Sequence, residues 1–446
     1  MALFFGMVVV ACVFAARCTT ALSYDGSWYL YKVLDLQRPY LPDHRYSDAL
    51  LQYPVLLASH VTSNVRVLAL IFSFAYGSVT VLSLAACWWI LPRQRRSAFV
   101  WVAIGTATAV LPGWIFAVGE SMVAIPLFWP ILIGVASALP RRAIAIVVVS
   151  AGLLFFVHPV AAPYFLLAAL TALVTARHAP ERAKLLRAFG AGFVVLAALK
   201  TVLFFAQRSP YERGEMSVAD QVAHFNAGAA GIPAFVVLAG WVVLLLMIAR
   251  RRSPPDAVAR RTRDVELTLM GVAVLLLLLW ARDPSEWRAA LDYRELALFS
   301  VMPFMLTAAW ECAHAIDIGE DEAAHRRTLT NAAGFAFAVV VVVQASVWSA
   351  LQRRLRDEMA TSPTPCVALE SVKWVAGTPL YHWATPVYAV LLQGRAPERL
   401  ALPARDCADA MTSGRIHIKR TEFFSEYRAR SGGWFDFSRA GLSDGR

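Results

Sequence analysis

The sequence predicts an all-α polytopic membrane protein with about eleven transmembrane helices and a small extracytoplasmic C-terminal domain. Of its 446 residues, 58% are hydrophobic and only 16% are charged, and the mean hydropathy is +0.54. Such a chain carries more apolar surface than a soluble domain can bury. Its long runs of Val, Leu, Ala and Phe have close to the roughly 20 residues that a helix needs to cross the hydrocarbon layer.

The apolar runs define the predicted transmembrane domain, residues 1–350, in order along the chain. The fifth and sixth runs are short and only four residues apart, so they are either two tilted helices or a re-entrant pair. The predicted spans are 3–16, 67–91, 98–118, 121–139, 143–157, 161–175, 189–206, 233–249, 267–281, 296–310 and 332–348.

The orientation follows from the basic residues, because short loops rich in Lys and Arg stay in the cytoplasm. The even-numbered connections hold 17 basic residues and the odd-numbered ones hold 9. We therefore expect a multi-pass protein of a bacterial inner membrane, with its N-terminus in the cytoplasm and its tail outside. The net charge of +11 reflects this topology, and we expect no nucleic-acid partner. Residues 1–22 have a second interpretation, a cleaved signal peptide.

The tail, residues 351–446, replaces the apolar runs with Pro, Arg, Asp and Gly and is long enough for a small domain. It contains Cys366 and Cys407. Outside the cytoplasm a bridge between them is allowed, and closing a loop of about 40 residues would stabilise the tail by roughly 3–4 kcal/mol. The alternative is a pair of unrelated free thiols. The cysteine spacing does not resemble a zinc site.

The first outer loop, residues 21–66, is long for a connection between two spans, and such loops are usually functional or disordered. Its stretch "SWYLYKVL" puts Trp28, Tyr31 and Leu34 on one side at helical spacing. This pattern predicts a helix that lies in the membrane interface. Tyr and Trp also favour that depth in general, so an interfacial aromatic belt is the simpler interpretation.

Asp25 follows the first span in the stretch "YDG", where a turn would hold it against the outer face. A long hydrophobic chain with an inside N-terminus, an acid after the first span, a long first outer loop and a soluble outer tail resembles the GT-C class of membrane glycosyltransferases. The resemblance is of layout along nearly all the chain. It implies a polyprenyl-phosphate sugar as donor and a first-loop acid that acts at the acceptor. Several branches carry two adjacent acids, whereas Gly26 follows Asp25 here, so the branch and any divalent cation stay open.

Moving a sugar from a phosphate to a hydroxyl requires a carboxylate that takes the acceptor proton and cations that stabilise the departing phosphate. Asp25 and Glu120 are the candidate catalytic acids; Glu120 is also explained as a helix-start acid. The metal is unresolved, and the acceptor is a glycan, a lipid or a protein. The candidate phosphate-binding residues are Arg38, His44, Arg45, His158, Arg282 and Arg294.

Three other classes of protein compete with the transferase. A secondary transporter or flippase of a lipid-linked or anionic substrate would have a similar number of spans, but its polar residues usually lie near the bilayer midplane. The main charge inside a span here is Lys200. A membrane acyltransferase would need a His and Asp pair that the spans lack. A non-enzymatic envelope assembly protein is the third alternative.

Overall fold

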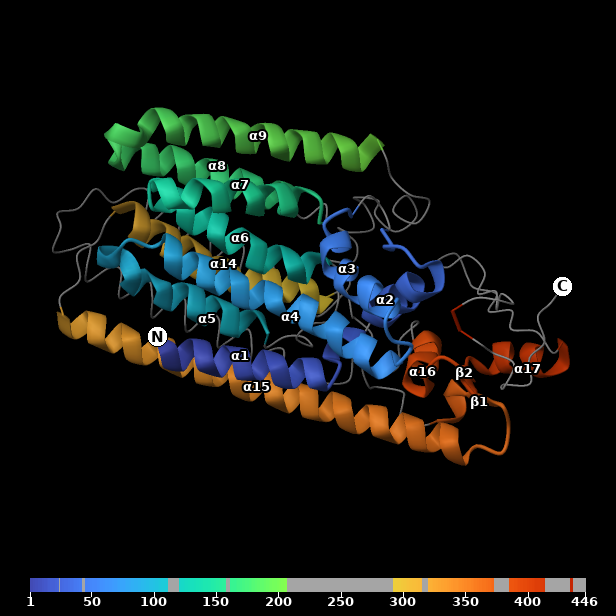
Figure 1. Cartoon of the computed structure of the whole chain (residues 1–446). Helices are drawn as coiled ribbons and strands as arrows, with labels where there is room; N and C mark the ends of the chain where they lie inside the picture. Colours follow the sequence, from blue (N-terminus) through green and yellow to red (C-terminus); the bar gives the residue numbers. More distant parts are fainter. Residues whose placement is uncertain are drawn as a thin grey trace.

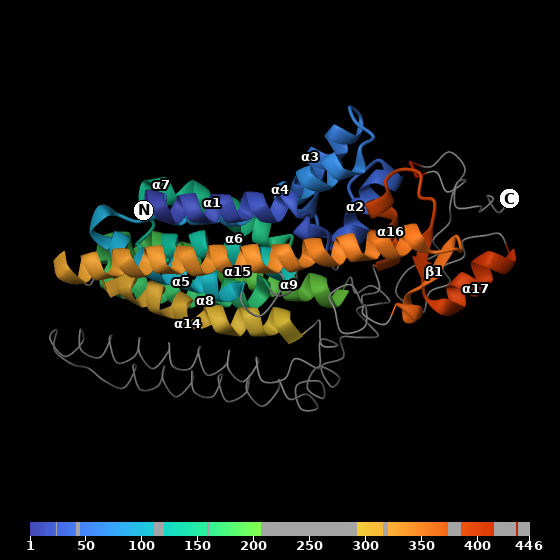
Figure 2. The same cartoon turned by 90° about the horizontal axis from the view of Figure 1, so that it is seen from below.

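The computed structural model of the chain is a mostly helical bundle with a small appended tail (Figure 1). It describes residues 1–23, 25–41, 45–110, 120–157, 161–206, 292–314, 320–372, 385–413 and 434–435. The long helices run along a common direction, and both views agree on this (Figures 1 and 2).

The bundle helices match the apolar runs closely within the described part of the chain. Nine of the eleven predicted spans overlap a helix, 98–118 only in its first half because 111–118 lie outside the described residues, as do the whole of 233–249 and 267–281. Helix α1 packs against α15, α5 against α14, α4 against α6, and α8 against α9. The helices are α1 Ala2–Arg17, α4 Val65–Ile90, α5 Phe99–Ala109, α6 Glu120–Ala136, α7 Arg141–Phe155, α8 Ala161–His178, α9 Ala183–Ala206, α14 Asp292–His314 and α15 Glu320–Thr361.

Three segments in the described ranges are long and apolar enough to cross a membrane: Val65–Ile90, Pro180–Ala206 and Glu322–Thr361. Ala2–Arg17 and Val123–Ala136 are shorter apolar helices. The bundle also leaves large apolar side chains exposed, such as Val195 and Val202 on α9. A mostly helical chain with these properties is compatible with a membrane protein, and the number of eleven spans stays a prediction.

The two ends of the bundle differ in the elements that lie beside them. We call the end beside α2 (Asp25–Leu36), α3 (Asp48–Ser59) and α16 (Thr385–Gln393) the tail end, and the opposite end the far end (Figure 1). At the far end, Arg142 donates to the carbonyls of Ile90 and Leu91 at 3.1 and 2.9 Å, and Arg95 donates to that of Cys312 at 2.6 Å. Basic side chains thus satisfy the last carbonyls of α4 and α14, which helix ends leave without partners.

Helix α15 is longer than the predicted span 332–348, because the polar residues on both sides of the apolar run are also helical. It begins at Glu320 and ends at Thr361, just before Ser362 and Pro363. It crosses α1 closely at Gly334, where an added Cβ would lie 2.6 Å from the Phe4 ring. The predicted tail boundary at residue 351 therefore falls inside α15.

The turn after α1 is fixed by α15. The chain leaves α1 at Cys18, adopts a left-handed conformation at Thr19 (φ 51°) and forms a short 3-10 helix, η1 (Thr20–Leu22), before α2. Gln352 donates to the Cys18 carbonyl and to the Thr19 hydroxyl, both at 2.9 Å, and Trp348 Nε1 donates to the Thr19 carbonyl at 3.2 Å. The first outer loop therefore starts in a defined direction.

The first outer loop forms two helices, α2 and α3. Trp28, Tyr31 and Leu34 do lie on a helix, but all three side chains are buried inside the protein rather than lying at a membrane interface. The prediction of an interfacial helix was wrong in this respect, because the tail covers α2: α16 packs on it, and Phe435 stacks on Tyr31 with ring centroids 4.6 Å apart.

The tail is small and tied together by a disulfide. Strands β1 (Cys366–Ala368) and β2 (Leu400–Leu402) pair in parallel, with Cys366 opposite Leu400. Helix α17 (Ala404–Ser413) follows β2, and Cys407 on it forms the disulfide with Cys366 that the sequence favoured. The remaining described elements are the 3-10 helices η3 Arg93–Ala98, η4 Pro180–Arg182 and η5 Leu369–Ser371.

We expect Gln352→Ala to lower the free energy of unfolding by about 0.5–1.5 kcal/mol, because a partly buried carbonyl and hydroxyl lose their donor. Chemical denaturation of the purified protein in mixed micelles measures this. Asp357→Ala, a change of an exposed residue on the same helix, is the control. Equal stability of the two variants would contradict a clamp by Gln352.

Candidate functional site

The structure describes some of the predicted site residues completely, some only in their backbone, and some not at all. Asp25, Arg38 and Arg45 lie in described segments. Glu120 is the first residue of α6 and Arg294 the third of α14, but the positions of their side chains lie outside the described structure. His44, His158 and Arg282 fall outside the described residues.

Helices α6 and α14 begin at the tail end, because both finish at the far end. Helix α14 ends where Arg95 of η3 binds the Cys312 carbonyl, and α6 ends just before the start of α7, where Arg142 binds the end of α4. The starts of α6 and α14 therefore lie at the same end of the bundle as α2 and α3 (Figures 1 and 2). This is the arrangement that a site shared by Asp25, Glu120 and Arg294 requires.

Asp25 opens α2, where it is half-buried. The predicted turn at "DG" is replaced by the first turn of a helix, and the Gly26 amide donates to the Ser23 carbonyl at 3.2 Å. The Ser23 hydroxyl in turn donates to the Thr20 carbonyl at 2.8 Å. The helix dipole favours a carboxylate in the first turn, so the position also has a structural explanation.

Arg45 lies beside the face of α2 that carries Asp25. Its Nη1 donates to the Tyr29 hydroxyl at 3.3 Å. Tyr29 is four residues after Asp25, and residues at this spacing are neighbours on one helix face. The fold therefore brings the Arg45 guanidinium to Tyr29, one helical turn after Asp25 on α2.

A second set of hydrogen bonds holds the loop between α2 and α3. The Tyr40 amide donates to Gln52 Oε1 at 2.7 Å, and Gln52 Nε2 donates to the Tyr40 carbonyl at 2.9 Å. The rings of Tyr40 and Tyr29 pack edge to face, with their centroids 5.6 Å apart. Gln52 is buried on α3, so α3 and α2 are locked together around Tyr29.

Arg38 is not part of this arrangement. It follows Gln37, which has a left-handed backbone (φ 49°) and closes the end of α2 by donating to the Leu34 carbonyl at 2.6 Å. Arg38 is exposed in the turn that results. Sequence reasoning missed Tyr29 and Gln52; the spacing of four between Asp25 and Tyr29 was the available signal.

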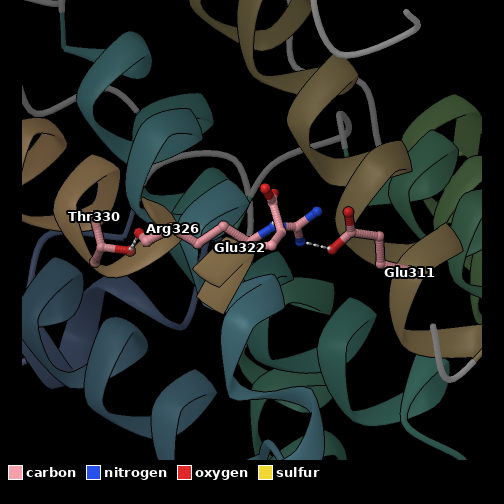
Figure 3. A network of polar contacts seen from close by, with 4 residues as sticks. All are labelled: Glu311, Glu322, Arg326 and Thr330. Carbon is pink, nitrogen blue, oxygen red and sulfur yellow. Dashed lines mark hydrogen bonds and ion pairs between the residues drawn. The ribbon is translucent and has the colours of Figure 1, made fainter. Parts of the chain in front are cut away.

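A different polar cluster lies at the far end, between α14 and α15 (Figure 3). Arg326 Nη1 is 2.6 Å from Glu311 Oε2, and their side chains are only 7% and 5% exposed. Arg326 Nε also binds the more exposed Glu322 at 2.8 Å, and the Arg326 carbonyl accepts from Thr330 at 2.8 Å. The guanidinium lies 5.8 Å from the Trp101 ring of α5. The cluster joins three helices.

Two histidines meet beside this cluster. The ring centroids of His178, at the end of α8, and His314, at the end of α14, are 4.2 Å apart. Burial lowers the pKa of His314; its hydrogen bond with the Trp310 carbonyl opposes this, and the neighbouring His178 lowers the pKa further. His314 is therefore neutral near pH 7 and closes the contact between α8 and α14. Within the described ranges, His, Cys, Asp and Glu side chains form no group of three that could hold a metal ion.

Comparison with known proteins returned no matching family model, no matching curated protein and no matching solved structure. The structure itself separates two polar regions. The tail end combines Asp25 and Tyr29, one helical turn apart on α2, with Arg45, which binds Tyr29, and the far end contains the buried pair of Arg326 and Glu311. The buried pair has the burial and partners of a structural contact, whereas the tail end offers an acid on α2 and a cation that binds the same helix one turn further on.

We expect Arg326→Met to lower the free energy of unfolding by about 3–5 kcal/mol, because Glu311 becomes a buried charge without its partner. The exposed neighbour Arg327→Met should change it little. Adding Glu311→Leu to Arg326→Met should restore much of the loss. Denaturation of the four proteins in micelles tests this, and a double variant no more stable than the single one would contradict the pairing.

Proposed function

We propose that the protein is a membrane glycosyltransferase that moves a sugar from a polyprenyl-phosphate donor to an acceptor on the outer side of the membrane. The observation that carries the proposal is the face of α2 shared by Asp25 and by Tyr29, which binds Arg45. In the reaction, the acceptor hydroxyl oxygen bonds to the anomeric carbon of the sugar as the bond from that carbon to the phosphate oxygen breaks. Asp25 takes the hydroxyl proton, and the lipid phosphate leaves as an anion.

Arg45 is the favoured phosphate ligand, since a guanidinium binds phosphate through two parallel hydrogen bonds. Arg294, His44, His158 and Arg282 stay candidates for the same task, and Arg38, exposed in its turn, is the weakest. Glu120 stays the second candidate acid. If a divalent cation takes part, the carboxylates of Asp25 and Glu120 are the ligands of the right chemistry, because hard cations prefer oxygen.

The layout of the chain supports the same proposal. We infer about eleven spans, with the far end in the cytoplasm, the tail end outside and the whole chain in a bacterial inner membrane. The Cys366–Cys407 disulfide agrees with this, because disulfides persist outside the reducing cytosol. The acceptor is a glycan, a lipid or a protein that reaches the tail end.

The buried pair of Arg326 and Glu311 favours a second candidate, a flippase of a lipid-linked anion, because ionisable groups inside membrane bundles often mark transport paths. The pair lies at one end of the bundle rather than at mid-depth, which weakens this alternative. Incubating the purified protein with a radiolabelled polyprenyl-phosphate sugar and candidate acceptors separates the two, since only a transferase releases free lipid phosphate.

We expect Asp25→Asn to lower sugar transfer by about 10²–10⁴-fold, because the amide does not accept the acceptor proton. Transfer of the label from lipid to acceptor measures it. Asp357→Asn, an exposed acid near the tail end of α15, is the matched control and should keep full activity. Insertion of both variants into the membrane should match that of the parent protein. Full activity in Asp25→Asn would remove Asp25 from the mechanism.

A reporter fused after Arg446 should show an extracytoplasmic location, because the asymmetry of basic residues places the tail outside. Alkaline phosphatase, which is active only outside the cytoplasm, suits the test. The same reporter fused to a chain that ends at Arg187, in the basic first turns of α9 at the far end, should be inactive. The reverse pattern would overturn the topology.

A further inference from the structure

A groove of about 560 Å³ opens on the side of the bundle between α1, α3 and α4. Val13, Leu50, Leu70 and Phe74 contribute to its apolar wall. Ser78 also lines it, but its hydroxyl donates to the Ala75 carbonyl of its own helix at 2.7 Å. The wall is therefore apolar along almost its whole length.

The groove faces away from the protein core. Leu50 and Phe74 are 58% and 55% exposed, and both are large apolar residues. One of its walls is α4, which is long and apolar enough to span a membrane. In a bilayer the groove would be filled by hydrocarbon chains, and apolar burial alone would not select one lipid over another.

To select one lipid over another, the groove needs a charged group, and Arg17 is such a group. Among the described residues that line the groove, Arg17 is the charged one. It is the last residue of α1 and is exposed. The clamp of α15 on Cys18 and Thr19 fixes the chain directly after it. A cation at a helix end is also favoured by the dipole, so Arg17 by itself would carry no inference; its place on an apolar groove is what matters.

The elements that line the groove contact those that carry the candidate site. Arg17 is separated from Asp25 only by the clamped turn and η1, and Leu50, on its other wall, belongs to α3, which is locked to the loop after α2. A lipid with its chain in the groove and its phosphate at Arg17 would have its head near the start of α2. A single groove suits a lipid with a single hydrocarbon chain, whereas a glycerophospholipid has two hydrocarbon chains.

We propose that this groove binds the hydrocarbon chain of a polyprenyl phosphate, with Arg17 binding its phosphate. The proposal rests on the proposed function and identifies where the donor lipid lies. In this proposal Arg17 binds the lipid phosphate, and Ser78 lies in the wall of the groove beside the hydrocarbon chain. Arg45 then binds the same phosphate from the side of α2, and Asp25 acts on the acceptor hydroxyl.

The test is direct binding of a radiolabelled polyprenyl monophosphate to the full-length protein in nanodiscs. Arg17→Gln should weaken binding about tenfold, because a charge-assisted hydrogen bond to phosphate is lost. Arg66→Gln, an exposed arginine at the start of α4 outside the groove, is its control. Ser78→Trp should weaken binding by filling the groove, and Val148→Trp, on the exposed surface of α7, should not. Melting temperatures show that all four variants are folded.

Two results would overturn the proposal: unchanged binding in Arg17→Gln or Ser78→Trp, or displacement of the label by phosphatidylglycerol at equal mole fraction, which would make the groove a general lipid cleft. A sugar-transfer assay separates its failure from that of the proposed function. If the parent protein transfers sugar and both groove variants keep its affinity for the donor, the groove proposal fails and the transferase stands. If the variants lose the lipid but the parent transfers no sugar, the groove stands and the transferase fails.

Discussion

The tail end of this protein depends on the grip of α15 on the turn between α1 and α2. Trp348 and Gln352 are one helical turn apart, so both reach the same place on the neighbouring chain. Gln352 donates to the Cys18 carbonyl, at the end of α1, and Trp348 donates to the Thr19 carbonyl, which also accepts the Leu22 amide of η1. Because the turn is fixed, the direction of α2 is fixed too. The positions of Asp25 and Tyr29 follow from it.

Most of the helices could be predicted, because a continuous apolar run of suitable length permits little else in a membrane. The limits of α15 could not, since hydropathy identifies only its apolar middle, while the polar flanks carry good helix formers that extend it on both sides. The burial of Tyr31 could not be predicted from the sequence either. Its stacking partner, Phe435, lies near the other end of the chain, and local periodicity contains no information on such a contact.

The candidate site was predictable in kind but not in detail. Asp25 was a predicted catalytic acid and Arg45 one of six predicted phosphate-binding residues, because acids and cations beside a membrane span suit transfer from a phosphate. That Tyr29 joins them, and that Gln52 fixes the loop between the two helices, depends on hydrogen bonds that form only in the fold. A role for Arg17 could not be predicted, because the groove beside it forms only when three helices pack together.

Helix α15 has 42 residues, which makes it roughly 63 Å long at 1.5 Å per residue. The hydrocarbon layer is only about 30 Å thick, so a large part of this rod must stand clear of the lipid. Because the tail continues directly from the rod and its helix α16 also rests on α2, the tail has a set height above the bilayer. Under the proposed function, an acceptor would meet a platform at constant distance from the membrane, and only groups able to reach that height could be modified.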